Sequence, residues 1–277
     1  MVKTALVTLH YNEIELSQFF FRHYDPIVDH YVIYDDQSDD GSREILEAHP
    51  RVELRDRNAG HIVDDTEHIR IKEETCAELL QHYDWVIVVD FDEFLQPRDN
   101  TRYTLRSLLE RYQREGVNWP TTYGFDMIDD HVPTDGVLTE QLRCGVPNSL
   151  YSKYAIVGRG VQPNYASGCH TAKPIGKVVE SKQREINLLH YKYMSQESVL
   201  AESRRCKISK RNNETGQGWT KLDGKPIKST DYWPLWYKRA YPNRRKVFEM
   251  PRPDYSKCTF TMESWPDKAW SQFDDLL

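Results

Sequence analysis

The first hundred residues alternate between short apolar runs and longer segments in which apolar residues recur at helical spacing. The apolar runs predict four strands, at residues 5–9, 31–34, 52–54 and 85–89. The segments between them predict three helices, at residues 14–24, 42–49 and 64–83. Because strand and helix alternate in this way, we expect right-handed βαβ units that build a parallel sheet.

The pattern changes beyond about residue 100. The predicted elements there are a helix at 103–115, strands at 117–128 and 149–157, and a basic helix at 195–213. From residue 215 the chain is rich in Gly, Pro, Trp and basic residues and shows no clean periodicity, so we expect an irregular C-terminal extension.

Three of the four predicted N-terminal strands end in polar residues. Residues 10–13 follow the first strand, Asp35 and Asp36 the second, and Asp90 and Asp92 the fourth. Ligands of open α/β sheets bind at the carboxyl ends of the strands. One acidic loop would be an ordinary solvated loop, but three at the same edge predict a binding site.

The end of the fourth strand is the most informative of the three. Its apolar run stops at Asp90 and Asp92, which are separated by Phe91 and therefore point the same way in an extended chain. No Lys or Arg occurs in the seven residues before them. Two such carboxylates form a hard-oxygen site for Mg²⁺ or Mn²⁺, and an ion held there can bridge the phosphates of a nucleotide. The plainer alternative is a capped turn after a buried strand.

Composition narrows the class of protein. The chain is 39% hydrophobic and 29% charged, and no apolar run approaches the ~18 residues of a membrane span, so we expect a folded, soluble protein. The net charge of -6 argues against a nucleic-acid partner. The five cysteines are scattered without a C-x-x-C pair, and the N-terminus has no signal-peptide pattern, so we expect a cytoplasmic location.

Five segments together match the motifs of a known family. They are Thr8-Leu9-His10-Tyr11-Asn12-Glu13, Tyr34-Asp35-Asp36-Gln37-Ser38-Asp39-Asp40-Gly41-Ser42, Asp90-Phe91-Asp92-Glu93-Phe94-Leu95, Gly168-Cys169-His170 and Leu189-His190-Tyr191-Lys192. In these segments the chain resembles the nucleotide-sugar glycosyltransferases of the GT-A fold, most closely the branch of glycosyltransferase family 2 that is related to family 92. The resemblance is closest over residues 1–100, extends to about residue 210 and is absent from the tail.

The resemblance implies a GT-A fold, which is a Rossmann-like mixed sheet flanked by helices. It divides the chain into a nucleotide-sugar-binding half at residues 1–100, an acceptor-binding half at 101–214 and an aromatic and basic extension at 215–277. It also implies transfer of a sugar, with inversion, from a nucleoside-diphosphate donor to a glycan or lipid-linked acceptor.

The metal ligands are also assigned by resemblance. In the family, an aspartate-any-aspartate motif binds Mn²⁺ or Mg²⁺, which neutralises the diphosphate leaving group. Asp92 takes that role here, and Asp90 helps to hold the metal or faces the ribose. His190 is the candidate third ligand because imidazole suits Mn²⁺, although a hydrogen-bonded structural histidine is an equally good interpretation.

The donor contacts implied by the resemblance lie at several strand ends. Lys192 reaches the diphosphate, while Asp36, His10 and Asn12 meet the base and the ribose. Turn chemistry alone also explains residues 39–42.

Two basic regions, one in the second half and one in the extension, allow a simple and a functional interpretation. Residues 204–211 form either a solvated helix face or a grip on the diphosphate or on an anionic lipid-linked acceptor. Basic and aromatic residues at 237–246 permit peripheral contact with the inner face of a membrane.

An inverting transfer needs a carboxylate base that deprotonates the acceptor hydroxyl. The candidates are Asp126, Asp129, Asp130 and Glu93. The sequence does not choose between Asp126 and Asp130, and Glu93 alternatively orients a metal ligand. The chain lacks the Glu-Asp pair that many family members use as base, and it has Met194-Ser195 where many have Lys-Ser. The base and the phosphate contacts therefore stay open.

Other functions compete with a glycosyltransferase. A sugar nucleotidyltransferase needs a glycine-rich basic loop after the first strand, whereas residues 10–13 contain no glycine and include an acid. A non-catalytic nucleotide-sugar or glycan-binding module is disfavoured by the intact pair Asp90 and Asp92, although only turnover excludes it. A Rossmann dehydrogenase is disfavoured because no G-x-G-x-x-G follows the first strand.

Overall fold

The N-terminal half of the chain folds around a five-stranded sheet with the strand order β3-β2-β1-β5-β9. This computed structural model describes residues 1–216, 218–222 and 225–250. The strands are β1 (Thr4–His10), β2 (His30–Asp35), β3 (Val52–Asp56), β5 (Trp85–Val88) and β9 (Ile156–Gly158). The first four are parallel, and β9 is antiparallel to β5. Because β1 lies between β2 and β5, the strand order reverses beside it, as it does at the ligand crevice of Rossmann-like sheets.

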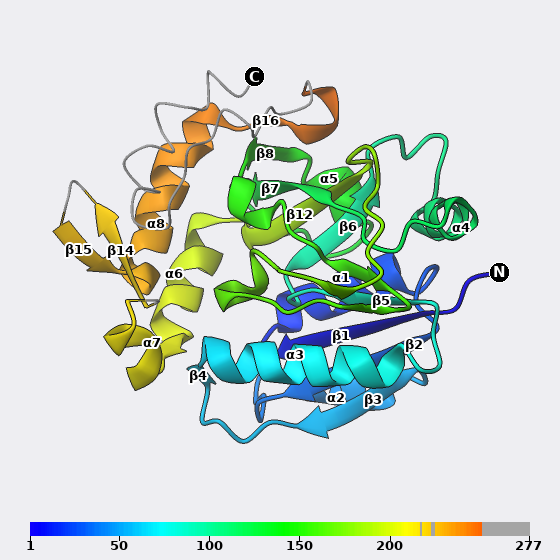
Figure 1. Ribbon diagram of the computed structural model, residues 1–277. Coiled ribbons are helices and arrows are strands. Elements are labelled where there is room, and N and C mark those ends of the chain that lie inside the picture. The colour runs from blue at the N-terminus through cyan, green and yellow to red at the C-terminus, as the bar shows by residue number, and fades with distance from the viewer. Residues whose placement is uncertain (217, 223–224, 251–277) are drawn as a thin grey trace.

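Helices cover both faces of this sheet (Figure 1). They are α1 (Ile14–Tyr24), α2 (Ser42–Ala48) and α3 (Asp65–Leu79). Neighbouring strand residues point to opposite faces. Leu6 therefore packs in one core with Phe20 of α1, and Val7 packs in the other core with Cys76 of α3. The predicted α/β class with a Rossmann-like sheet is confirmed, and α1 has the predicted bounds.

A second sheet with the order β16-β8-β7-β12-β6 carries the other half of the fold. Its strands are β6 (Glu93–Pro97), β7 (Thr122–Ile128), β8 (Cys144–Pro147), β12 (Ile186–Tyr193) and β16 (Arg245–Lys246). The chain leaves β5 through Asp90 and Asp92 and enters this sheet at Glu93. Strand β12 runs between β7 and β6, and its register sets His190 beside Asp126 on one side and beside Glu93 on the other.

Six further described elements connect the strands of the two sheets. They are β4 (Ile62–Val63), α4 (Leu105–Glu115), α5 (Leu138–Gln141), β10 (Val161–Gln162), η2 (Ser167–Cys169) and β11 (Ile175–Gly176). Helix α4 begins with a capping box formed by Thr104 and Ser107 and ends at Gly116, whose φ of 74° is a helix-ending conformation that glycine adopts without strain.

Two of the predicted elements beyond residue 100 are wrong. The segment predicted as one helix at 195–213 is divided into α6 (Gln196–Arg205), β13 (Lys207–Ile208) and α7 (Lys210–Glu214). The helix ends because β13 pairs with β4 of the N-terminal half, which requires extended backbone. The segment predicted as a strand at 149–157 begins as the 3₁₀ turn η1 (Ser149–Tyr151) and becomes a strand only at β9.

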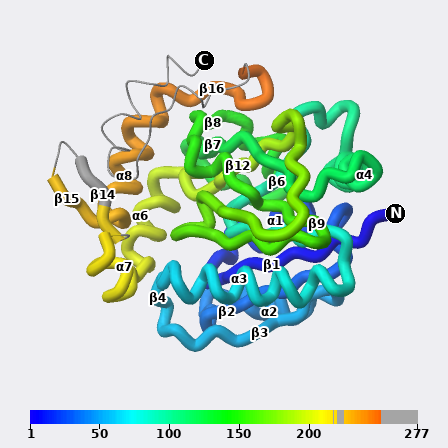
Figure 2. The backbone as a smooth tube through the Cα atoms, viewed as in Figure 1, coloured from blue at the N-terminus to red at the C-terminus, as the bar shows by residue number. Residues whose placement is uncertain are grey.

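The described part of the C-terminal extension is regular rather than irregular. A hairpin of β14 (Trp219–Leu222) and β15 (Lys225–Lys228) leads into α8 (Ser229–Ala240) and then into two 3₁₀ turns, η3 (Tyr241–Asn243) and η4 (Val247–Glu249). Helix α8 packs beside α6 (Figure 2). Trp236 of α8 shares a third core with Val146 and Tyr193 of the second sheet. Residues 251–277 of the predicted extension lie outside the described residues.

Gly124 offers a test of how the segment with η1 is seated on β7. A Cβ at Gly124 would lie 2.2 Å from the Tyr151 carbonyl carbon and 2.5 Å from the Asn148 carbonyl oxygen. These are backbone atoms, so Gly124→Ala forces the whole segment outward and should lower the free energy of unfolding by about 1–3 kcal/mol, measured by urea denaturation. An unchanged unfolding midpoint would contradict this seating.

Candidate active site

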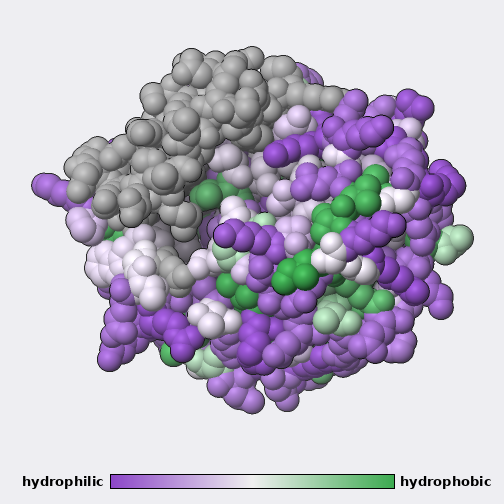
Figure 3. Space-filling view, in the orientation of Figure 1, coloured by the Kyte–Doolittle hydropathy of each residue, from purple (hydrophilic) through white to green (hydrophobic). Residues whose placement is uncertain are grey.

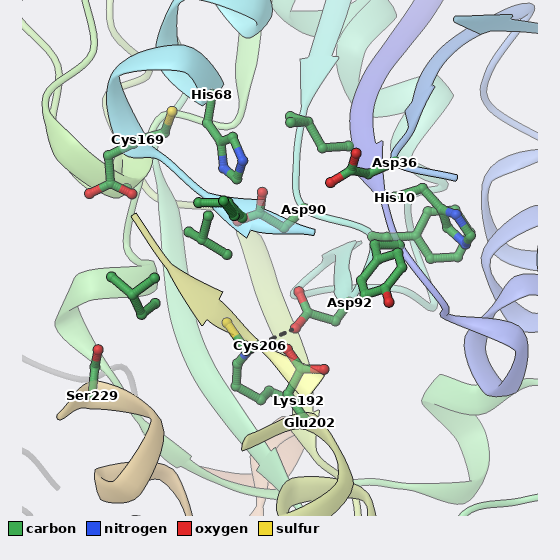
Figure 4. Close-up of a pocket in the computed structure, with 18 of the residues that line it drawn as sticks. His10, Asp36, His68, Asp90, Asp92, Cys169, Lys192, Glu202, Cys206 and Ser229 are labelled. Atoms are coloured by element: carbon green, nitrogen blue, oxygen red, sulfur yellow. Dashed lines mark hydrogen bonds and ion pairs between the residues drawn. The ribbon is translucent and has the colours of Figure 1, made fainter. Parts of the chain in front are cut away.

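A cavity of about 370 Å³ opens at the carboxyl edge of the first sheet, where the sequence predicts a site. Its lining includes the predicted residues His10 and Asp36, together with Asp90 and Asp92 after β5. The opposite wall comes from the second half of the chain, with His190 and Lys192 of β12 and residues of α6 and α8. Figure 4 shows Asp92, Lys192 and Glu202 close together, with Asp90 and His68 farther along the same cavity. The three acidic strand ends therefore do converge, and both halves of the fold contribute to one cavity.

The centre of the cavity wall is His190, which lies between two carboxylates. Its Nε2 is 3.2 Å from Asp92 Oδ2, and its Nδ1 is 2.7 Å from Asp126 Oδ1. The ring of Tyr151 stacks on the imidazole at a centroid distance of 3.8 Å. The position and orientation of the imidazole are thus fixed on three sides.

Asp126 is itself held in place by two further donors. Asn148 Nδ2 donates to Asp126 Oδ2 at 2.7 Å, and Trp236 Nε1 donates to the same oxygen at 3.0 Å. Trp236 belongs to α8, so a helix from the C-terminal extension supports the residue that orients His190.

Electrostatics favour the protonated form of His190. Burial lowers its pKa, but the carboxylates of Asp92 and Asp126 outweigh burial and raise the pKa to about 9. The same contacts suit a metal ligand, because a carboxylate that accepts a hydrogen bond from Nδ1 leaves Nε2 directed at an ion.

Asp90 lies in a different environment from Asp92. Lys72 of α3 donates a hydrogen bond to Asp90 Oδ1, and Lys153 Nζ lies 3.6 Å from Oδ2. Lys153 also lies 2.6 Å from Glu93 Oε1, and the Asp90 backbone N–H donates to Glu93 Oε2 at 2.9 Å. Burial raises the pKa of Asp90, but Lys72 and Lys153 outweigh it and hold the pKa well below the ordinary value. Two buried lysines therefore neutralise Asp90 and Glu93.

The predicted donor-binding residues are divided between two cavities. Asp36 accepts hydrogen bonds from Arg57 at 3.0 Å and from the backbone N–H groups of Ala59 and His61 at 2.9 and 2.8 Å, so it shapes the loop that follows β3. His10 lines the large cavity and contacts Asp35 at 2.9 Å.

Asn12 does not line the large cavity. It lines a neighbouring cavity of about 240 Å³, where its Nδ2 donates to Asp39 at 2.8 Å. Lys192 lines both cavities; its Nζ lies 3.9 Å from Asp92 and 4.1 Å from the centroid of the Trp233 ring.

None of the four predicted bases, Asp126, Asp129, Asp130 and Glu93, lines either cavity. Asp126 and Glu93 are fully buried, and their carboxylates contact His190 and Lys153, respectively. Asp130 lies on an exposed turn, where it accepts a hydrogen bond from Tyr241 at 2.9 Å. Their positions favour structural roles.

The donor set of the cavity fits a divalent cation in part. Asp92 and His190 offer a carboxylate and an oriented imidazole at one point, which suits Mn²⁺ or Mg²⁺. Asp90 is committed to lysines instead. Among the described residues, one group of three potential metal ligands has its ligand atoms within 4.8 Å of one another. This group consists of Asp129, Asp130 and His131, and it lies outside the cavity.

Several residues of the site carried no signal in the sequence. Lys72 and Lys153 are far from Asp90 along the chain, and Trp236 resembles any core tryptophan. Glu13 and Tyr11 do belong to a matched segment, and in the structure the Tyr11 ring stacks on His61 at a centroid distance of 3.9 Å. Register and packing, rather than spacing, bring these groups together.

Comparisons with known proteins find little similarity. No protein-family model matches the sequence, and no curated protein matches it. Among solved structures, a protein described as a nucleotide-diphospho-sugar transferase from Desulfovibrio desulfuricans G20 is 13% identical with a TM-score of 0.28, over 46% of this chain and 59% of that one.

Two further structures are similarly remote. 4-Diphosphocytidyl-2C-methyl-D-erythritol synthase is 12% identical with a TM-score of 0.28, over 57% of this chain and 73% of that one. HddC from Yersinia pseudotuberculosis is 11% identical with a TM-score of 0.27, over 69% of this chain and 77% of that one. This chain spans less than two thirds of the length of the Desulfovibrio protein. These values carry no conclusion about activity, so we base the functional proposal on the site.

None of the described helices is long and apolar enough to cross a bilayer. The part of the face that is coloured by hydropathy in Figure 3 is mainly hydrophilic, with apolar residues in small groups. Tyr237, in the segment predicted to touch a membrane, is buried and donates to the Asp129 carbonyl at 2.6 Å. Membrane contact stays a prediction.

The two carboxylates around His190 should make stability depend on pH. The pKa of about 9 in the folded protein exceeds the ordinary value of 6.5. The proton therefore stabilises the metal-free protein below pH 6.5, and this contribution, on the order of 3 kcal/mol, is lost as the pH rises through 9. Urea denaturation across this window measures the loss, and Asp126→Asn should make it smaller.

Asp130→Asn is the control for this measurement, because Asp130 is exposed and does not contact His190. It should leave the pH dependence of the wild-type protein unchanged. A wild-type stability that does not fall between pH 6.5 and 9 would show that the two carboxylates do not raise the pKa of His190.

Proposed function

We propose that this protein is a glycosyltransferase that uses Mn²⁺ or Mg²⁺ and a nucleoside-diphosphate sugar, and that it transfers the sugar with inversion to a glycan or lipid-linked hydroxyl. The observation that carries the proposal is the Asp92–His190–Asp126 arrangement, in which Asp92 and His190 line a cavity at the carboxyl edge of a Rossmann-like sheet and Asp126 is buried behind them. Such edges bind nucleotides, and an imidazole oriented by a buried carboxylate is a usual feature of metal sites.

The proposed cation site uses Asp92 and His190 as ligands. A divalent ion bound there would supply positive charge that stabilises the diphosphate leaving group. Asp126, Asn148 and Trp236 hold the imidazole in the orientation that this role needs. Asp90 is assigned here to charge balance with Lys72 and Lys153 rather than to the ion.

Basic side chains line the cavity, each beside a carboxylate with which it forms an ion pair. Burial lowers the pKa of Lys192, but Glu202 and Asp92 outweigh burial and raise it, so the ammonium stays charged. Its Nζ lies 3.3 Å from Glu202, within reach of a diphosphate placed near Asp92. Arg57 and Arg205 line the same cavity. A diphosphate can therefore meet positive charge from β12, from α6 and from the loop after β3.

The nucleoside is assigned to the end of the cavity near β1 and β2. The stacked rings of Tyr11 and His61 offer an aromatic surface there, and Asp36 fixes the backbone beside it. Aromatic faces stack on nucleobases without strong preference for one base, so this arrangement supports nucleotide binding and leaves the base unspecified.

The second candidate is a nucleotide-sugar-binding module without turnover. It is favoured by the state of Asp90, which two buried lysines neutralise. A module of this kind would bind a sugar nucleotide through Lys192 and the arginines without needing a metal.

Thermal shift with UDP, GDP, CMP, dTDP and their common sugars, each in Mn²⁺, Mg²⁺ or EDTA, separates these functions. A ligand at about 100 times its Kd adds about 2.7 kcal/mol to the stability of the native state. That corresponds to a rise in Tm of roughly 5–10 °C for a chain of this size. We expect one nucleotide class to give such a rise only when a divalent cation is present.

Asp92→Ala should abolish the cation-dependent part of the shift and turnover, while leaving the fold intact. Glu44→Ala, at an exposed position on α2, is the matched control and should behave like the wild-type protein. Nearly wild-type activity of Asp92→Ala would exclude the metal assignment. A shift of equal size in EDTA would favour the binding module.

A further inference from the structure

The smaller cavity adjoins the proposed donor cavity and shares part of its wall. It has a volume of about 240 Å³ and lies between α1 and α6. The residues that line both cavities are Glu13, Asp92, Lys192, Glu202 and Arg205. The side of the shared wall away from the nucleotide is therefore open to a second molecule.

The remaining lining of the smaller cavity is mixed. Ile14, Leu16 and Met194 are apolar, whereas Asn12 and Ser198 present polar groups. A sugar ring or polyol has the same mixture, with C–H faces and a rim of hydroxyls. The chemistry of this cavity thus suits a hydroxyl-bearing acceptor better than a second anion.

Three carboxylates of the shared wall could in principle accept a proton, but two have other partners. Asp92 contacts His190, and Glu202 accepts hydrogen bonds from Arg205 and from Lys192. Glu13 differs from both. Among the described residues its side chain accepts no hydrogen bond, and its ion-pair partner, Arg205 Nη2, is 3.7 Å away.

The position of Glu13 leaves its carboxylate available. It is the N-cap residue of α1, but its side chain does not cap the helix; only its backbone carbonyl accepts from Leu16 and Ser17. The side chain is 24% exposed, so it is reachable from the cavities and is still largely removed from water. Burial, Glu202 and Asp92 all raise the pKa of Glu13, which makes the carboxylate a stronger base than an ordinary glutamate.

We propose that the smaller cavity is the acceptor site and that Glu13 is the base of the transfer. This inference rests on the proposed function. Glu13 takes the proton of the acceptor hydroxyl, and the acceptor oxygen forms a bond to the anomeric carbon of the donor. The bond from that carbon to the diphosphate oxygen breaks, and its electron pair leaves with the nucleoside diphosphate. Lys192, which lines both cavities, lies beside the departing charge.

Water can replace the acceptor in the test, because donor hydrolysis needs the same proton removal. The probe is the sugar nucleotide that gives the largest cation-dependent rise in Tm, and the readout is release of nucleoside diphosphate. Glu13→Gln keeps the size of the side chain and removes the base, so kcat for hydrolysis should fall by about 10²–10⁴-fold. The rise in Tm with donor should stay at the wild-type value, and Glu13→Asp should retain part of the activity.

Two comparison variants separate catalysis from binding and folding. Glu202→Gln removes the partner of Lys192 and Arg205, so it should raise the KM for the donor more than it lowers kcat. Glu44→Gln makes the same chemical change at an exposed position on α2 and should leave both parameters unchanged.

The outcomes distinguish the inference from the function on which it rests. If no donor raises the Tm of the wild-type protein, the proposed function is wrong and the inference falls with it. If the wild-type protein hydrolyses its donor and Glu13→Gln does so at a similar rate, Glu13 is not the base. If Glu13→Gln loses donor binding together with turnover, Glu13 is a binding or structural residue. If the wild-type protein binds the donor but releases no nucleoside diphosphate, both the role of Glu13 as base and the proposed transfer are wrong.

Discussion

The contact of His190 with Asp92 and Asp126 is the interaction on which the rest of the site depends. It joins the loop that leaves the first sheet to two neighbouring strands of the second. A buried imidazole between two carboxylates keeps its proton, or exchanges it for a metal ion, at little electrostatic cost, whereas a buried imidazolium with no partner would be strongly destabilising. The two sheets therefore meet at a point where charge is balanced only if both are correctly placed.

The same principle explains the environment of Asp90. Two acids, Asp90 and Glu93, lie beside two buried lysines, Lys72 and Lys153. Removing one partner from such a group leaves an uncompensated buried charge, which typically costs about 3–5 kcal/mol. The arrangement consequently holds the end of β5, helix α3 and the segment before β9 in one geometry. It also makes Asp90 and Asp92, which are only two residues apart, chemically different from each other.

The C-terminal extension belongs to the site. Trp236 donates to Asp126, and the ring of Trp233 lies against the ammonium of Lys192. The pairing of β13 with β4 fastens the segment before the extension to the N-terminal half. Because α6 and α8 pack together on this side, the helix that lines the smaller cavity is braced by the helix that supports His190.

The sequence by itself determined the N-terminal half. Its strands and helices have strong, local hydrophobic periodicity, so α1 could be predicted to the residue and the acidic strand ends could be expected at one edge of a parallel sheet. In the second sheet, β6, β8 and β12 are buried along nearly their whole length and carry no alternation that local reasoning can detect. Only the tertiary structure decided which charges meet, namely Lys72 and Lys153 with Asp90, and Asp126 with His190. It also decided that Glu13 lies in the wall shared by the two cavities. These contacts follow from sheet register and helix packing between residues distant along the chain, and no local pattern of residue types encodes them.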